Sequence, residues 1–186
     1  MKYLSNFYVI LFFGLFVFAS CNDNEEMEVE NEEEIITTLT YTLTSTDNEV
    51  AILTFRDLDG DGSGAADITV SNLTANTTYQ GFIVLLNESE TPAENISEEV
   101  AEEDDDHQFF FAVSDAELSV DYVDADGNGN PLGLATTLTT GDAGTGTLTV
   151  TLRHEPNKTA DGVAGGDISN AGGETDIEVT FPITIE

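Results

Sequence analysis

Two histidines and a run of acids are the residues of this chain best suited to chemistry. The 186-residue sequence contains only two histidines, His107 and His154, and the stretch AEEDDDHQFFF places the first directly after five acids. Glu103 precedes His107 by four residues, so their side chains approach each other if a helix extends that far. Imidazole nitrogen together with carboxylate oxygen suits zinc or copper, so His107, His154 and Glu103 form a candidate metal site. The alternative is that His107 caps its strand or pairs with a neighbouring acid, and that His154 merely ends its own strand.

Two acidic loops carry the beginning of a calcium-binding motif. DLDGDG at 57–62 and DADGNG at 124–129 share the spacing in which alternate oxygens and a glycine turn wrap one cation. Neither loop has a glutamate at the twelfth position, although Asp67 could replace that ligand in the first loop. Aspartate and glycine also favour plain turns, which is the alternative. The candidate calcium ligands are Asp57, Asp59, Asp61 and Asp67 in the first loop and Asp124, Asp126 and Asn128 in the second.

Catalytic motifs are not found in the sequence. There is no nucleophile elbow, no phosphate-binding loop and no zinc-protease histidine pair. The single cysteine is Cys21, near the start of the chain. We therefore expect a protein that is not an enzyme.

The first residues predict export and a lipid anchor. One lysine precedes an apolar run from Phe7 to Phe18, which is the pattern of a signal peptide and is shorter than the roughly 20 residues of a membrane-spanning helix. The residues FASC resemble the lipobox of bacterial lipoproteins. That resemblance implies a signal peptide over residues 1–20 and a lipidated Cys21, whereas a chance cysteine after an ordinary signal peptide is the alternative.

Residues 21–34 predict a solvated tether, because Asn22–Glu34 has eight acids in thirteen residues and no apolar periodicity. An acidic run after a lipidated cysteine also resembles the signal that carries Bacteroidota lipoproteins to the outer face of the outer membrane; a simple linker is the alternative. The formal net charge of −33 excludes nucleic acid as a partner and favours cations or basic surfaces.

Residues 35–186 predict an all-β domain. Alternation with period two, as in Leu39, Tyr41 and Leu43, indicates half-buried antiparallel strands. We expect about nine strands, one short helix from Pro92 to about Asp104, and Pro182 on an edge strand. Expected strands include 49–56, 67–72, 79–87, 108–114, 118–123 and 134–140, besides alternating runs after Ile35, around Val150 and around Val179.

The fold class expected for such a chain is an immunoglobulin-like β-sandwich. LTANTTY at 73–79 resembles the tyrosine corner of fibronectin type III domains, in which the hydroxyl of the tyrosine, here Tyr79, ties a turn to the main chain. A capping box at Thr91 and Glu94 is expected to begin the helix.

Four stretches of the sequence resemble flavobacterial envelope lipoproteins commonly labelled "type 1 periplasmic-binding fold superfamily protein". These stretches are DLDGDG, TPAENISEEVAEEDDDHQFFF, LRHEPNK and GGETDIEVTF. The resemblance spans nearly the whole mature domain and implies ligand or nutrient handling at the outer membrane, beside a transporter. Two functions follow as expectations. One is a monomeric module that binds a small ligand or a metal ion, Ca²⁺ or Zn²⁺/Cu²⁺; the other is a structural or adhesive surface domain with an acidic, calcium-stabilised face. The lipoprotein could face the cell surface or the periplasm.

Millimolar calcium should raise the melting temperature of the domain through the loop that contains Asp57, Asp59 and Asp61. A cation that binds only the folded state stabilises it by mass action, and extracellular calcium sites typically bind this weakly. Thermal unfolding with and without calcium measures the effect. An unchanged melting temperature, or an equal gain in the Asp59→Ala variant, would contradict the prediction.

Overall fold

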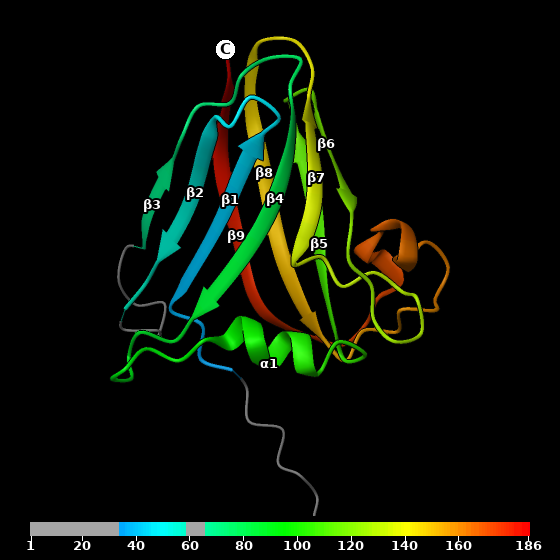
Figure 1. Cartoon of the computed structure of the whole chain (residues 1–186). Helices are drawn as coiled ribbons and strands as arrows, with labels where there is room; N and C mark the ends of the chain where they lie inside the picture. The colour runs from blue at the N-terminus through cyan, green and yellow to red at the C-terminus, as the bar shows by residue number, and fades with distance from the viewer. Residues whose placement is uncertain (1–33, 59–65) are drawn as a thin grey trace, which may run out of the picture. The chain divides into compact units, whose positions relative to one another are not determined.

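The computed structural model describes residues 34–58 and 66–186, which form a β-sandwich of two antiparallel sheets (Figure 1). These residues contain nine strands, one α-helix and two short 3-10 helices. The predicted all-β sandwich of about nine strands with one short helix is therefore confirmed.

The larger sheet has six strands in the order β3-β2-β1-β4-β7-β6. Leu39, Tyr41 and Leu43 on β1 are fully buried, while the threonines between them lie on the opposite face. Such alternation is what a sheet with one buried face requires. The strands are β1 (Thr38–Ser45), β2 (Val50–Arg56), β3 (Asp67–Val70), β4 (Thr78–Leu86), β6 (Leu118–Tyr122) and β7 (Ala135–Thr140).

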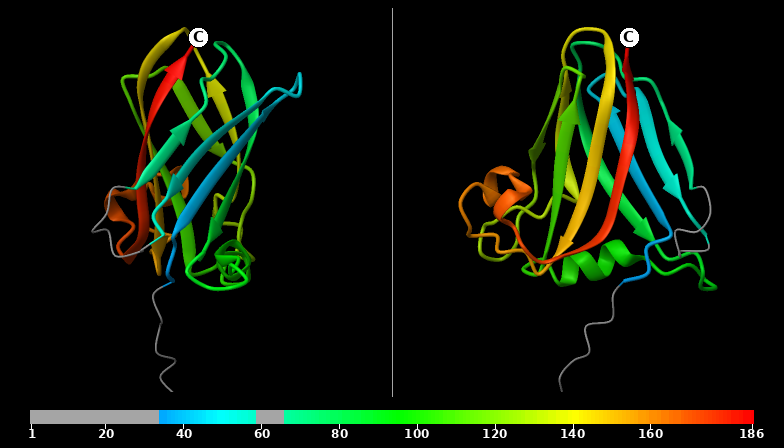
Figure 2. Two further views of the ribbon diagram at one scale, coloured as in Figure 1. Left: turned by 90° about the vertical axis from the view of Figure 1, so that its left-hand side faces the viewer. Right: turned by 180° about the vertical axis from the view of Figure 1, so that it is seen from behind.

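The smaller sheet has three strands in the order β5-β8-β9, namely β5 (His107–Ser114), β8 (Gly144–His154) and β9 (Glu174–Ile185). Pro182 lies on the edge strand β9, as its missing N–H donor predicts. The connection from β8 to β9 folds over the outer face of this sheet (Figure 2) and contains η1 (Val163–Gly165) and η2 (Ile168–Asn170). Val163 in this connection packs on Phe110 of β5 and buries it.

The strand order is not the A-B-E-D and C-F-G order of immunoglobulin constant domains. The shared features are the layered architecture and one local motif, the tyrosine corner. The hydroxyl of Tyr79, which is buried at the start of β4, accepts a hydrogen bond of 2.8 Å from the main-chain N–H of Thr74. The tyrosine therefore ties this turn to the main chain, as predicted.

The helix is shorter than the sequence predicts: α1 spans Ile96–Glu102. The expected capping box is wrong, because Glu94 and Asn87 exchange main-chain hydrogen bonds of 3.0 and 3.1 Å in an isolated β-bridge. A residue paired in this way cannot also supply the third position of a helix. The helix begins at Ile96, two residues after Glu94, with Asn95 as the N-cap.

One end of the sandwich, which we call the base, is covered by α1 (Figure 1). Strands β5 and β9 begin there and β8 ends there. The leading segment, Glu34–Thr37, also reaches β1 at this end and is held by Thr37, whose main-chain N–H bonds the carbonyl of Leu86 at 3.0 Å. The helix α1, the ends of β5, β8 and β9, and the leading segment thus meet at the base.

A chain that starts at Glu32 should fold as a soluble monomeric sandwich, because the buried core of the described residues begins at Leu39. Circular dichroism of residues 32–186 should show a strand-dominated spectrum, and light scattering should report a monomer. A spectrum dominated by helix, or a chain without a cooperative unfolding transition, would contradict this account of the core.

Candidate metal centre

The two histidines are neighbours at the base. His107 begins β5 and His154 ends β8, and the antiparallel register pairs them directly. Their rings stack with centroids 4.7 Å apart and planes 9° from parallel. His107 is fully buried and His154 is 8% exposed, because α1 and the leading segment close this end of the sandwich.

Three ligand atoms converge beside this pair. One atom each of Glu34, His107 and Asp176 lies within 4.8 Å of the other two. Nε2 of His107 is 3.3 Å from Oε1 of Glu34 and 3.8 Å from Oδ2 of Asp176. Neither contact is aligned as a hydrogen bond, so Nε2 of His107 and Oδ2 of Asp176 are buried polar atoms without a hydrogen-bond partner. Buried polar groups normally have partners, which makes this cluster unusual.

The orientation of His107 is set by its other nitrogen. Nδ1 lies 3.2 Å from the main-chain carbonyl oxygen of Glu103. A carbonyl oxygen can only accept, so Nδ1 carries hydrogen and Nε2 points toward the carboxylates. Metal-binding histidines are commonly oriented by this kind of second contact.

Glu103 therefore contributes its main chain and not its side chain. The expected i, i+4 approach of its carboxylate to His107 requires a helix through His107, whereas α1 ends at Glu102 and Glu103 is its C-cap. The Glu103 side chain is exposed. The carboxylates that do approach His107 belong to Glu34 and Asp176, neither of which the sequence pattern indicates.

A β-bulge turns Asp176 toward the interior. The pairing of β8 with β9 shifts between Leu152 and Arg153, so that Leu152 faces Ile177 and Arg153 faces Thr175. Asp176 is the extra residue, and bulges are known to re-aim a side chain in this way. In a regular strand Asp176 would point away from Ile177 and out of the core.

Gly173 permits the chain to return to β9 so close to the histidines. Its φ is +67°, and a Cβ atom there would lie 2.1 Å from the main-chain oxygen of His154. Only glycine tolerates both the conformation and the approach. The double glycine before β9 thus helps to position Asp176.

The pKa values of Asp176 and His107 are both raised. Burial raises the pKa of Asp176 to about 6, and the charge of Glu34 adds to the rise while His107 opposes it. Burial by itself lowers the pKa of His107, but contact with Glu34, the Glu103 carbonyl and the charge of Asp176 together raise it. The cluster therefore attracts positive charge.

The cationic side chains of the described residues are engaged elsewhere. Arg56 pairs with Glu88 at 2.7 Å, and Lys158 pairs with Asp126 at 3.1 Å. Arg153 donates to the carbonyls of Gly172 and Gly173 and to the Thr175 hydroxyl. The nearby charge of Arg153 lowers the pKa of Asp176 without cancelling the rise that burial causes. A proton or an added cation would therefore complete the neutralisation of the cluster.

A small polar cavity opens beside the cluster. Its volume is about 60 Å³, and it is lined by Glu34, Glu174, Thr175 and Asp176. A cavity of this size accommodates an ion together with water, since one water needs about 10–15 Å³ by this measure. The cavity provides a path by which a cation can reach the ligands.

The second acidic loop is hydrogen-bonded in a way that argues against calcium. Asp124 accepts from the main-chain N–H groups of Gly133 and Ala135 at 2.7 and 2.9 Å. Asp126 is buried and accepts from Asn130 and from the ammonium of Lys158. Asn128 donates its amide to Asp105 at 2.7 Å. A calcium ion would have to displace these donors, so the plain-turn alternative describes this loop.

Only part of the first acidic loop lies within the described residues. Asp59 and Asp61 lie outside the described residues. Asp57 and Asp67 flank the gap, and the main-chain N–H of Asp57 donates to Thr37 at 2.8 Å. The proposal of calcium in this loop therefore stays a prediction.

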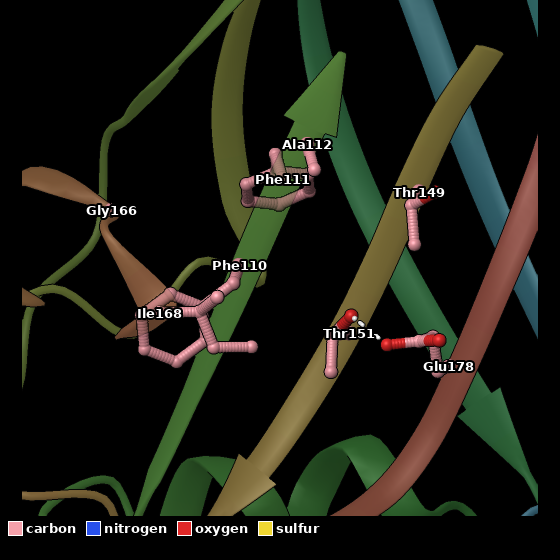
Figure 3. Close-up of a pocket in the computed structure, with 8 residues that line it drawn as sticks. All are labelled: Phe110, Phe111, Ala112, Thr149, Thr151, Gly166, Ile168 and Glu178. Carbon is pink, nitrogen blue, oxygen red and sulfur yellow. Dashed lines mark hydrogen bonds between the residues drawn. The ribbon is translucent and has the colours of Figure 1, made fainter. Parts of the chain in front are cut away.

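Two surface hollows offer less chemistry than the base. One has a volume of about 160 Å³ on the outer face of the smaller sheet (Figure 3), where Phe110 and Ile168 form one wall and a 3.2 Å hydrogen bond joins Thr151 to Glu178. The other, of about 300 Å³, is lined mainly by threonines with Asn48 and Gln80. Small-molecule sites usually have about 300–1,000 Å³ and converging polar groups. Neither hollow matches that description as well as the cluster matches a metal site.

Comparisons with protein-family models, with curated proteins and with solved structures found no match to this chain. Across residues 34–58 and 66–186, no helix has the length and apolar character needed to cross a membrane. The interpretation of the site therefore rests on its own geometry.

Without added metal, the domain should lose stability as the pH rises from about 5 to about 8. Asp176 and His107 both have pKa values raised by folding, so each stabilises the folded state at low pH and loses that contribution as the pH passes its folded pKa. The free energy of unfolding in chelator should fall by on the order of 1–2 kcal/mol over this range. Thermal unfolding at each pH measures it.

The matched control is Asp176→Asn, which cannot ionise and should flatten much of this pH dependence. Asp121→Asn, on the exposed side of β6, should behave like the wild type. A wild-type domain that becomes more stable between pH 5 and pH 8 in chelator would contradict the inferred titration of the cluster.

Proposed function

We propose that this protein is a non-enzymatic envelope lipoprotein whose β-sandwich binds one transition-metal ion between Glu34, His107 and Asp176. The observation that supports this function best is the cluster itself: three ligand atoms converge, and two of them are buried without a hydrogen-bond partner. A bound cation would satisfy these atoms and remove the repulsion between the two carboxylates.

The spacing of the ligand atoms suits zinc. Ligands about 2.1 Å from a tetrahedral ion are about 3.4 Å apart. The distances of 3.3 and 3.8 Å from His107 Nε2 to the two carboxylates are close to that value. Three protein ligands leave a fourth position for water, which the adjoining polar cavity can hold.

The donor set favours zinc or copper over calcium. Calcium takes six to eight oxygen ligands, whereas this cluster offers one imidazole nitrogen and two carboxylates. His154 lies beside the cluster, but its ring is nearly parallel to that of His107, so the nitrogen atoms of the two rings do not aim at one point. We therefore assign the three ligands to Glu34, His107 and Asp176.

The cellular setting is proposed from the sequence. The signal-like residues 1–20 and the lipobox-like FASC support lipidation of Cys21 and attachment to the outer membrane. The similarity to flavobacterial envelope lipoproteins supports a role in nutrient handling near an outer-membrane transporter. A monomeric module on an acidic tether would then capture the ion at the cell surface or in the periplasm.

A structural or adhesive domain is the second candidate. It is favoured by the apolar side chains of Ile52, Phe82 and Val84, which are 40 to 54% exposed on the outer face of the larger sheet. Such patches mark interaction surfaces when they are large and contiguous. The convergence of Glu34, His107 and Asp176 at the base instead favours the binding module.

Residues 22–186, without a histidine tag, should bind one Zn²⁺ per chain with micromolar or tighter affinity. His107→Gln and Asp176→Asn should each weaken binding by at least about tenfold, because each removes one of three ligands. Competition with a chromophoric chelator measures the affinity, and elemental analysis measures the stoichiometry.

Glu103→Ala is the matched control, since the main-chain carbonyl that orients His107 stays in place. This variant should bind zinc as tightly as the wild type. Undetectable binding by the wild type at micromolar zinc, or equal binding by Asp176→Asn, would refute the proposed function.

A further inference from the structure

The three proposed ligands belong to parts of the chain that differ in how firmly they are held. His107 lies on β5, paired with β8 and oriented by the Glu103 carbonyl. Asp176 lies in the bulge of β9, also paired with β8. Glu34 precedes β1 and lies in the leading segment, which is not part of a strand. The cluster thus joins two strands of the smaller sheet to the segment that leads into the larger sheet.

The leading segment has an anchor that does not depend on the cluster. Thr37 is buried and bonds Leu86, Glu88 and Asp57 through its main chain and hydroxyl at 2.8 to 3.1 Å. Before it, Ile36 packs partly against the core and Ile35 is 55% exposed. Thr37 should therefore stay docked whether or not an ion is bound.

The position of Glu34 depends on how the charge of the cluster is neutralised. Its carboxylate is 10% exposed and faces the buried carboxylate of Asp176 across His107. Two buried like charges repel strongly in a medium of low dielectric constant. Asp176 is held in a paired strand, so the repulsion acts to move Glu34. Glu34 lies outside any strand, and three residues separate it from the start of β1.

We propose that the bound metal ion latches the leading segment to the base, and that removal of the ion releases Glu34–Ile36 while the rest of the sandwich stays folded. This inference rests on the proposed function. It assigns to the ion a regulatory effect: the three released residues could extend from the base by up to about 10 Å. Ion binding would thereby control whether Glu34–Ile36 are docked on the base.

A spin label on Ile35→Cys in residues 22–186 reports the latch directly, because this fragment contains no other cysteine. Ile35 is already exposed, so the label should not disturb the core. The electron paramagnetic resonance spectrum should be broad with saturating zinc and should sharpen in chelator. A label on Val50→Cys, at a similarly exposed position on β2, should show the same spectrum in both conditions.

Glu34→Gln separates the latch from metal binding. This variant should bind zinc more weakly than the wild type does. When enough zinc is added to saturate the variant, the spectrum of the label at position 35 should still broaden less than the spectrum of the wild type. Glu90→Gln, an exposed loop carboxylate, is the control and should respond as the wild type does.

The outcomes distinguish the two proposals. If the chelator assay shows zinc bound but the Ile35 spectrum does not change, the latch is refuted and the metal-binding function stands. If Glu34→Gln broadens as fully as the wild type, the latch through Glu34 is also refuted. If the wild type binds no zinc, both proposals fail.

Discussion

The burial of two carboxylates against one imidazole nitrogen is the constraint on which the base of this sandwich depends. Glu34, His107 and Asp176 place their polar atoms within 4.8 Å in a region nearly closed to solvent. A buried charge in such surroundings needs a partner, because its desolvation free energy exceeds the attraction that a poorly aligned contact provides. The fold meets this need for Glu88 and Asp126 with Arg56 and Lys158, but no arginine or lysine of residues 34–58 and 66–186 makes a hydrogen bond to the cluster. A proton on His107 or Asp176, or a metal ion, would satisfy the buried atoms that have no hydrogen-bond partner.

A contrast within the same end of the molecule supports this interpretation. The acidic run before β5 and the loop around Asp126 meet at Lys158, whose ammonium bonds both Asp126 and the main-chain oxygen of Asp104. There a buried acid has a built-in cation and a full set of hydrogen bonds. The cluster at Glu34 has the opposite character, with unsatisfied buried oxygens and a cavity leading to them. One acidic site is structurally complete, and the other has the features of a site for an added ion.

Period-two alternation predicts most of the strands, and it places His107 and His154 on the core-facing rows of their strands. His107 continues the inward row of Phe109 on β5, and His154 continues the inward row of Leu152 on β8, so two adjacent strands bring them together. The same reasoning fails for Asp176, because strict alternation points it outward and a bulge reverses that direction. Glu34 was assigned to the acidic tether by composition, which cannot show that the last acid of a run docks against a strand. Glu103 was misplaced because the bridge between Asn87 and Glu94 and the early end of α1 are tertiary effects that propensity does not report.

X-ray absorption at the zinc edge of metal-loaded residues 22–186 tests the central claim most directly, because it counts the ligands around the ion. The account predicts a first shell of nitrogen and oxygen at about 2.0–2.1 Å, with scattering from a single imidazole and no sulfur. Replacement of His107 should remove the imidazole contribution. A shell that contains two or more imidazoles, or one that keeps its imidazole in the His107→Gln variant, would contradict the assignment of the ion to Glu34, His107 and Asp176.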